Sequence, residues 1–272
     1  GSFTAIDRDY MVELLSSAQE FIGENGFKGI RISTRPDAVD GEICDILEKY
    51  HVTAVELGAQ STNDKVLAMN RRGHTREDIF RSARLLKERG FELGLQMMTG
   101  LYGSNDEDSI GTARDIISLS PDTARIYPTV VIENTELAEL YRNGEYRPQT
   151  PEEAAVLCAK ILPMFENAGI KVIRLGLHSG GDVEGSFVAG AYHPALREMC
   201  EGHIYFDIIN RALSGKEKGK YIIYVAPREI SKASGQRRCN IEKLRELGYE
   251  CRIKENAALS ARDITLEKVN LL

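Results

Sequence analysis

The pattern of hydrophobic and polar positions changes period repeatedly along the first 177 residues. Short runs of β-branched and apolar residues, such as residues 52–57 and 91–98, are typical of buried strands. Between them, apolar residues recur three or four positions apart, as on one face of a helix. The strand–helix repeat takes roughly 30 to 40 residues, the spacing of right-handed crossovers between parallel strands. The pattern therefore predicts an α/β fold built on a parallel sheet or barrel.

Local signals place individual helices within this repeat. A first helix is expected after Asp7 or Asp9, with its apolar positions running to residues 21–22. Thr75 with Asp78 has the pattern of a capping box. A second strong start signal at residues 150–153 opens a helix that contains Pro163. The other expected elements are strands at 29–33, 123–129 and 170–175 and helices at 43–50, 108–119 and 135–141.

The repeat weakens after residue 177. Residues 180–181 and 192–194 are typical of loops, and residues 215–219 of a flexible link. Strands at 221–225 and 249–253, with a helix over 241–247 between them, predict a small terminal β-α-β unit. We therefore expect three regions: a barrel over 1–177, loops and a helix that close it over 178–215, and a small basic α/β unit over 216–272.

Charge is distributed unevenly around the net value of −6. Residues 213–254 contain 11 Lys and Arg against 5 Asp and Glu, a local net charge of +6, so the remainder carries −12. An acidic body does not favour wrapping nucleic acid, whereas the basic segment could contact phosphate. A solvated surface is the simpler interpretation of that segment, and both stay open.

The cysteines and the hydropathy indicate the compartment. Five cysteines are dispersed and odd in number, which is typical of a reducing environment, and none is spaced as a metal-binding cradle. No apolar run approaches the roughly 18 residues that span a bilayer, and no secretory signal opens the chain. The sequence therefore predicts a cytoplasmic protein that does not act in a membrane.

Polar side chains follow the strand predicted over 52–57. Glu56, Gln60 and Arg72 are expected at or just beyond its carboxyl end, where parallel sheets bind ligands. An acid, an amide and a guanidinium suit a ligand that carries hydroxyls, an amino group and a carboxylate. Each residue also has a purely structural interpretation: Arg72 in a surface ion pair, Glu56 as a buried acid satisfied by amides, and Gln60 as a helix cap.

Six ordered stretches carry a family resemblance. They are residues 1–4 (Gly-Ser-Phe-Thr), 33–37 (Ser-Thr-Arg-Pro-Asp), 56–61 (Glu-Leu-Gly-Ala-Gln-Ser), 72–75 (Arg-Gly-His-Thr), 98–104 and 125–132. Over residues 1–177 they resemble the radical S-adenosylmethionine (SAM) superfamily, in the branch of the elongator catalytic subunit and oxygen-independent coproporphyrinogen oxidase. Six ordered motifs on one repeat are specific where one alone would be weak. The terminal third shows no such resemblance.

The resemblance implies a partial, TIM-like (β/α) barrel that holds SAM and a [4Fe–4S] cluster. In such enzymes the cluster iron chelates the methionyl group, and an electron cleaves the sulfonium to a 5′-deoxyadenosyl radical. The implied partners are a small-molecule or RNA substrate and a reductant protein such as flavodoxin or ferredoxin. The implied class is an oxidoreductase or transferase, with the catalytic residues and the substrate unknown.

Roles carry over from the resemblance residue by residue. The backbone of Gly1 and Ser2 matches the turn that meets the methionyl amino group, Gln60 matches a residue near the ribose, and Arg72 matches an arginine that pairs with the methionyl carboxylate. The remaining candidates for cofactor binding are Ser33, Arg35, Glu56, Gln96 and Met98. Ser33 stands where relatives often carry an acid for the ribose hydroxyls, and Glu56 is expected to help there.

The largest departure from the family is the absence of its CxxxCxxC motif. In the family this motif lies upstream of the Gly-Gly turn, and this chain begins at that turn. Thiolates are the usual cluster ligands, so no metal ligand is assigned in the chain as given. We expect a piece of a longer enzyme that lacks the first βα unit of the barrel. The rival is a non-catalytic barrel that binds RNA or a protein partner; a metal-independent lyase lacks a suitable lysine.

Three histidines complete the candidates. His74 is interpreted as structural because it lies in a helix-entry turn. His178 and His193 lie near Gly-rich loops and could face the mouth of the barrel, although lone histidines are weak evidence. Tyr127 and Tyr192 are interpreted as packing aromatics whose hydroxyls find a partner.

Overall fold

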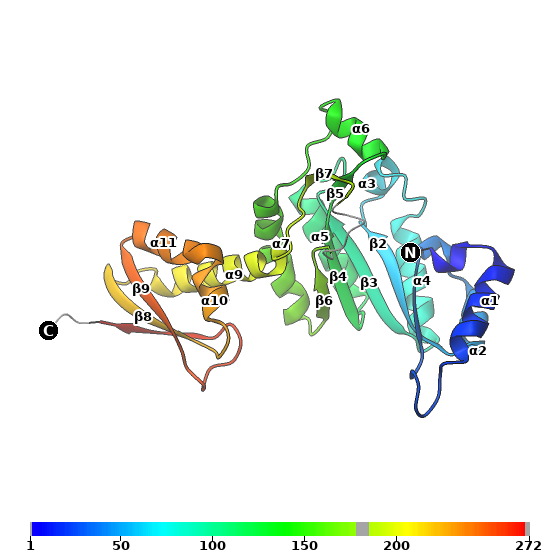
Figure 1. Ribbon diagram of the computed structural model, residues 1–272, viewed down its shortest axis with the longest axis horizontal. Helices are drawn as coiled ribbons and strands as arrows, with labels where there is room; N and C mark the ends of the chain where they lie inside the picture. The colour runs from blue at the N-terminus through cyan, green and yellow to red at the C-terminus, as the bar shows by residue number, and fades with distance from the viewer. Residues whose placement is uncertain (1, 178–184, 270–272) are drawn as a thin grey trace. The chain divides into compact units, whose positions relative to one another are not determined.

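The structure is a computed structural model that describes residues 2–177 and 185–269. Two compact units make up the chain, and each is described by itself. Unit 1 comprises Gly1–Thr150 and Ile161–Tyr192, and unit 2 comprises Pro151–Lys160 and His193–Leu272. Figure 1 shows the elements of each unit. This division into two units does not test the three regions that the sequence predicts, over 1–177, 178–215 and 216–272, which stay a prediction.

Unit 1 is built on a five-stranded parallel sheet with the order β1-β2-β3-β4-β6. The strands are β1 (Ile30–Thr34), β2 (Val52–Gln60), β3 (Glu92–Thr99), β4 (Thr123–Pro128) and β6 (Lys171–Leu175). A second pair, β5 (Val130–Ile132) and β7 (Phe187–Gly190), is antiparallel. The predicted α/β fold on parallel strands is confirmed.

Helices pack on one face of this sheet. Contacts join α2 (Gly41–Lys49) to β2, α4 (Arg76–Glu88) to β2 and β3, and α5 (Asp106–Ser118) to β3 (Figure 1). The side chains at this contact are fully buried; they include Leu47, Val55, Leu57, Leu86, Leu93, Leu95 and Ile116. Burying each such side chain contributes about 1.5 to 3 kcal/mol relative to exposure, so this face anchors the sheet.

Four helices, α1 (Arg8–Gln19), α4, α6 (Glu136–Arg142) and α7 (Pro151–Asn167), begin where the sequence signals place them, and α7 is shared between the two units. Asp7 caps α1 and Asn63 caps α3 (Asp64–Met69). Thr75 and Asp78 form the predicted capping box at α4. Thr135 caps α6, and α7 contains Pro163. Short 3-10 turns, η1 (Phe3–Ala5) and η2 (Pro36–Ala38), flank the end of β1.

One expectation for α1 was wrong. The helix ends at Gln19 instead of including Phe21 and Ile22, and Phe21 is 65% exposed. The chain turns here because the Phe21 amide bonds the Ala18 carbonyl and the Phe27 amide bonds the Phe21 carbonyl. Apolar residues at helical spacing therefore continued past the real end of the helix.

Unit 2 contains a three-stranded sheet with the order β10-β8-β9. β8 (Gly219–Val225) runs parallel to β9 (Tyr249–Glu255) and antiparallel to β10 (Ile264–Lys268). Its core joins this sheet to α9 (Leu196–Leu213), α10 (Ile230–Ser234) and α11 (Cys239–Glu246). The predicted β-α-β unit is confirmed, with β10 and α10 added to it.

No helix among the described residues is both long enough and apolar enough to cross a membrane.

Candidate functional site

The sheet of unit 1 carries polar side chains on the face opposite its helices. On β2, Val55 and Leu57 are fully buried against the helices, and Glu56 projects from the other side because neighbouring side chains alternate along a strand. Gln96 on β3 and Arg125 on β4 are register partners, so their side chains share one face. A barrel normally directs this face inward, where it can bind a ligand.

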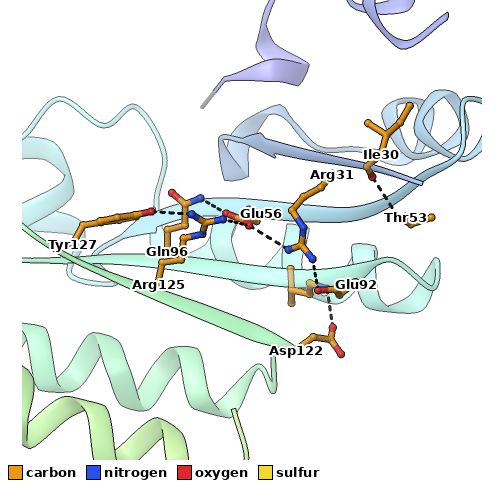
Figure 2. A network of polar contacts seen from close by, with 10 residues as sticks. Ile30, Arg31, Thr53, Glu56, Glu92, Gln96, Asp122, Arg125 and Tyr127 are labelled. Carbon is orange, nitrogen blue, oxygen red and sulfur yellow. Dashed lines mark hydrogen bonds and ion pairs between the residues drawn. The ribbon is translucent and has the colours of Figure 1, made fainter. Parts of the chain in front are cut away.

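Glu56 is the centre of this polar face (Figure 2). It is 2% exposed and accepts hydrogen bonds from three side chains. Its Oε1 lies 2.7 Å from Arg125 Nη2 and 3.2 Å from Arg31 Nη1, and its Oε2 lies 2.7 Å from Gln96 Nε2. Arg31 also bonds Glu92 at 2.6 Å. Both carboxylate oxygens of Glu56 are therefore occupied by protein groups.

This geometry corrects the placement of Glu56. The sequence analysis put it at or beyond a strand end, but β2 continues four residues further, to Gln60. Glu56 therefore lies within the strand, as a buried acid satisfied by two guanidinium groups and an amide. Its expected help with ribose hydroxyls stays a prediction; Oε1 already accepts two hydrogen bonds, whereas Oε2 accepts one and has a lone pair left for a further donor.

Arg125 links Glu56 to the phenol of Tyr127. Its Nη1 donates to Tyr127 Oη at 3.1 Å. Burial acts to lower the pKa of Arg125, but the hydrogen bonds with Tyr127 and Glu56 outweigh it and raise that pKa from its ordinary value. Within the described parts of the chain, Arg125 Nε and Thr123 Oγ1 are buried without a partner. Both lie on the polar face of β4, where a water or a ligand atom could satisfy them.

Gly94 leaves the space that Glu56 occupies. A Cβ at this position would lie 2.8 Å from Glu56 Cγ and 3.1 Å from Thr123 Oγ1. We expect Gly94→Ala to lower the free energy of unfolding by about 1 to 3 kcal/mol, because overpacking forces the buried acid away from its partners. A urea titration checks this. Gly111→Ala is the control, since a Cβ there meets nothing within 4 Å.

The second part of the site is the loop between α3 and α4. Arg72 is half-buried in this loop, and no carboxylate pairs with it among residues 2–177 and 185–269. Burial lowers the pKa of its guanidinium, and the charge of Arg35 lowers it further. Arg35 is itself paired with Asp37 and lies against Gly73, where a Cβ would be 2.7 Å from Arg35 Nη2. A half-buried cation beside a second cation favours an anionic ligand.

His74 holds this loop against β2. Its Nε2 lies 3.0 Å from the Ala59 carbonyl, which can only accept, so Nε2 carries the proton. The ring is 6% exposed, and its Nδ1 is buried without a partner in the described residues. The structural interpretation of His74 agrees with these contacts. Its ring fixes Arg72 at the end of β2.

Gln60 ends β2 in a left-handed conformation, with φ of 65°. The register between β2 and β3 shifts at this point. The side chain is 9% exposed, and within the described parts of the chain it forms no hydrogen bond. A non-glycine residue in the left-handed region at a strand end is typical of ligand sites, and the amide of Gln60 is free to bond a ligand there.

The other candidates fall into two hollows of unit 1. Arg72 and Met98 line one hollow together with Met69, Leu101 and Tyr102. Ser2 and Ser33 line another hollow beside α1 and β1. The chain before α1 is tied to β1 by Thr4, whose Oγ1 lies 2.6 Å from Thr34 Oγ1.

Two of the sequence candidates fall outside the described residues, and one belongs to the other unit. Gly1 and His178 are not described. His193 belongs to unit 2, where its Nδ1 accepts a hydrogen bond from the Ala195 amide at 3.1 Å. That bond is a local turn contact.

The residues present fit SAM and do not fit the iron–sulfur cluster. A half-buried arginine without a carboxylate partner suits the methionyl carboxylate, and the amide of the largely buried Gln60 suits a ribose hydroxyl. In contrast, the described residues contain no group of three His, Cys, Asp or Glu that could hold a metal. All five cysteines are free, and burial raises the pKa of Cys158 to about 12.

Comparisons with known families agree with this geometry. The chain matches the family described as Radical SAM superfamily over residues 2–116 and the Radical_SAM C-terminal domain over residues 121–205. The chain belongs to the radical SAM superfamily, whose members use SAM and a [4Fe–4S] cluster.

Named relatives place the chain near elongator-type proteins. It is 38% identical over 126 residues to the tRNA uridine(34) acetyltransferase of Methanocaldococcus jannaschii, covering 45% of this chain and 23% of the relative. It is 34% identical over 146 residues to human Elongator complex protein 3, covering 50% of this chain and 25% of the relative. The chain thus spans about a quarter of the length of these relatives.

Solved structures confirm the fold. The archaeal Methanocaldococcus infernus Elp3 with an N-terminal deletion matches with a TM-score of 0.63 and 25% identity, over 76% of this chain and 57% of that chain. Coproporphyrinogen III oxidase (HemN) from Escherichia coli matches with a TM-score of 0.51 and 18% identity, over 62% of this chain and 39% of that chain. The partial, TIM-like (β/α) barrel expected from the sequence is therefore confirmed.

The sequence analysis missed the roles of Arg31 and Arg125. The signal that could have found them is the alternation along their strands. Arg31 and Ser33 are two residues apart in β1, and so are Arg125 and Tyr127 in β4, so each pair lies on one side of its strand. The residues between and beside them, on the other side of each strand, are buried or largely buried. Charged residues at alternate positions of a buried parallel strand indicate a face that is not covered by helices.

Proposed function

We propose that the protein containing this chain is a radical SAM enzyme that acts on RNA. The reaction would be reductive cleavage of SAM to a 5′-deoxyadenosyl radical, which abstracts hydrogen from the substrate. RNA is proposed because relatives in the same superfamily are named as tRNA-modifying enzymes. The observation that carries the proposal is the unpaired, half-buried Arg72 in a loop fixed to the end of β2.

Each residue of the site would have a separate task. Arg72 would bind the methionyl carboxylate, and the Gln60 amide would bind a ribose hydroxyl. Ser2, Ser33, Gln96 and Met98 would complete the cofactor surface. The Glu56 network would keep Arg125 and Tyr127 in fixed positions on the inner face. Bound SAM supplies the radical chemistry, and the protein supplies orientation and exclusion of water.

Further parts of the proposal concern the rest of the enzyme. Cluster ligands would come from cysteines outside this chain, and an electron from a protein such as flavodoxin or ferredoxin. The enzyme would be an oxidoreductase or transferase of the cytoplasm, which is supported by five cysteines that are all free in the structure.

An anaerobic assay tests the proposal. The full reading frame containing this chain is purified without oxygen, incubated with SAM, dithionite and total RNA, and assayed for 5′-deoxyadenosine. Production of 5′-deoxyadenosine is the expected result. Its absence, in a preparation whose absorption spectrum shows a loaded cluster, would contradict the proposal.

A further inference from the structure

Unit 2 contains a cationic hollow that lies beyond the residues matched by either family. The matches end at residue 205, whereas the hollow is formed by β8, β9, α11 and the residue after β10. Its volume is about 480 Å³. Five cations and one carboxylate line it: Lys220, Arg238, Arg245, Arg252, Lys254 and Glu250. Such an excess of positive charge around one concavity favours an anionic ligand.

Three of these cations have no carboxylate partner in the described residues: Arg238, Arg252 and Lys254. The other two are paired, Arg245 with Glu242 at 2.8 Å and Lys220 with Glu250 at 3.7 Å. Surface cations near a protein's own carboxylates usually form ion pairs of this kind. The three unpaired charges are therefore available to an external anion.

The turn that carries Arg238 is strained and fixed. Arg237 and Arg238 are consecutive non-glycine residues in the left-handed region, with φ of 52° and 66°. The buried Asn240 holds the turn, because its Nδ2 bonds the Gly202 carbonyl at 2.8 Å and the Ala233 carbonyl at 3.1 Å. Strained backbone that the surrounding structure fixes is concentrated at binding sites. The backbone at Arg238 is therefore held in position before any ligand binds.

The arrangement of the charges favours a strand over a single anion. Arg252 and Lys254 alternate along the exposed side of β9, so their Cα atoms lie about 6.6 Å apart. Arg238 adds a third cation from the neighbouring helix start. Guanidinium groups match phosphate geometry, and a cationic groove that follows the backbone is how proteins hold single strands. Among the apolar lining residues, Tyr221, Ile241 and Cys251 are buried, Ile222 is half-buried and Val269 is 39% exposed, so most of the accessible lining is cationic.

We infer that the hollow of unit 2 binds the phosphate backbone of a single-stranded segment of RNA. This deepens the proposed function, since it assigns part of RNA binding to a region outside the radical SAM matches. Arg238, Arg252 and Lys254 bind phosphates, and the strained turn keeps the first of them in place. Base identity is not read here, because exposed cations contact the backbone.

Two charge-matched variants of the full-length protein test the inference. Arg252→Gln/Lys254→Gln removes two charges from the hollow. Arg211→Gln/Lys216→Gln removes two exposed charges of unit 2 outside it. Binding of a fluorescent single-stranded RNA is measured by anisotropy at salt concentrations from about 50 to 200 mM. Circular dichroism melting of both variants checks that they are folded.

The hollow variant is expected to weaken binding about fivefold or more and to reduce the salt slope by about 1.4, whereas the control stays near the parent. Equal affinities and slopes for the two variants would overturn the inference, as would no RNA binding by the parent at low salt. The result is separable from the proposed function, because 5′-deoxyadenosine formation is measured without reference to these residues. Loss of binding in the hollow variant alone supports the inference even if SAM is not cleaved.

Discussion

Replacing Arg72 with alanine is expected to weaken SAM binding by roughly 10- to 100-fold, because a charge-assisted hydrogen bond contributes about 1.5 to 3 kcal/mol. The structure leaves this guanidinium half-buried and without a carboxylate partner in the residues described. A ligand carboxylate would therefore supply its counter-charge. Isothermal titration of the anaerobic full-length protein with SAM measures the change.

Arg71 is a matched control for Arg72. It is the adjacent residue, but it is 77% exposed and paired with Glu136 at 2.7 Å. We expect Arg71→Ala to change SAM affinity by less than about twofold, because exposed ion pairs contribute little. Arg72→Lys should fall between parent and alanine, since lysine keeps the charge but loses the fork of donors. If the two alanine variants bind SAM equally, Arg72 is not the carboxylate ligand.

Replacing Glu56 with alanine is expected to lower the free energy of unfolding by about 2 to 4 kcal/mol. The acid is 2% exposed, and its removal leaves the cations of Arg31 and Arg125 facing each other. The expected loss of free energy of unfolding is smaller than for a fully buried ion pair, because the guanidinium groups of Arg31 and Arg125 are 39% and 30% exposed and water can solvate them in part. A shift of the urea midpoint measures it.

Glu92 serves as the control for Glu56, since it belongs to the same network. It bonds Arg31 at 2.6 Å but is 41% exposed. We expect Glu92→Ala to cost less than about 1 kcal/mol. Glu56→Gln keeps the shape but removes the charge, and should fall between parent and alanine. Equal midpoints for the Glu56 and Glu92 alanine variants would show that Glu56 is not the centre of the network.

The fold could be predicted from the sequence because local signals and tertiary packing agree. The capping box at Thr75 and the Thr150-Pro151 signal mark the first residues of α4 and α7. Residues 54–57 of β2 are all buried, so both sides of the strand are covered there. Where the elements are polar, prediction failed. β10 has three exposed residues among five, so its sequence does not differ from a solvated loop.

The candidate site could be predicted only in part, because distances across a sheet are not encoded locally. Gln60 and Arg72 were found from motifs, and both lie near the end of β2. Alternation along β1 and β4 could have put Arg31 and Arg125 on the polar face, but it could not have paired them with Glu56, because they lie 25 and 69 residues away in the chain. Only the register of four parallel strands brings these charges together.

The division of α7 between the two units has a consequence for folding during synthesis. Its first ten residues, Pro151–Lys160, belong to unit 2, whose strands are completed only with β10. At about 5 to 20 residues per second, the ribosome needs roughly 5 to 20 s to synthesise the chain from Lys160 to the end of β10. Until α9 is made, Glu152 lacks its partner His203, which lies 3.0 Å away in the folded chain, and the fully buried Cys158 lacks its neighbour Cys200. Nascent chains paused in this interval should therefore be the ones that chaperones retain.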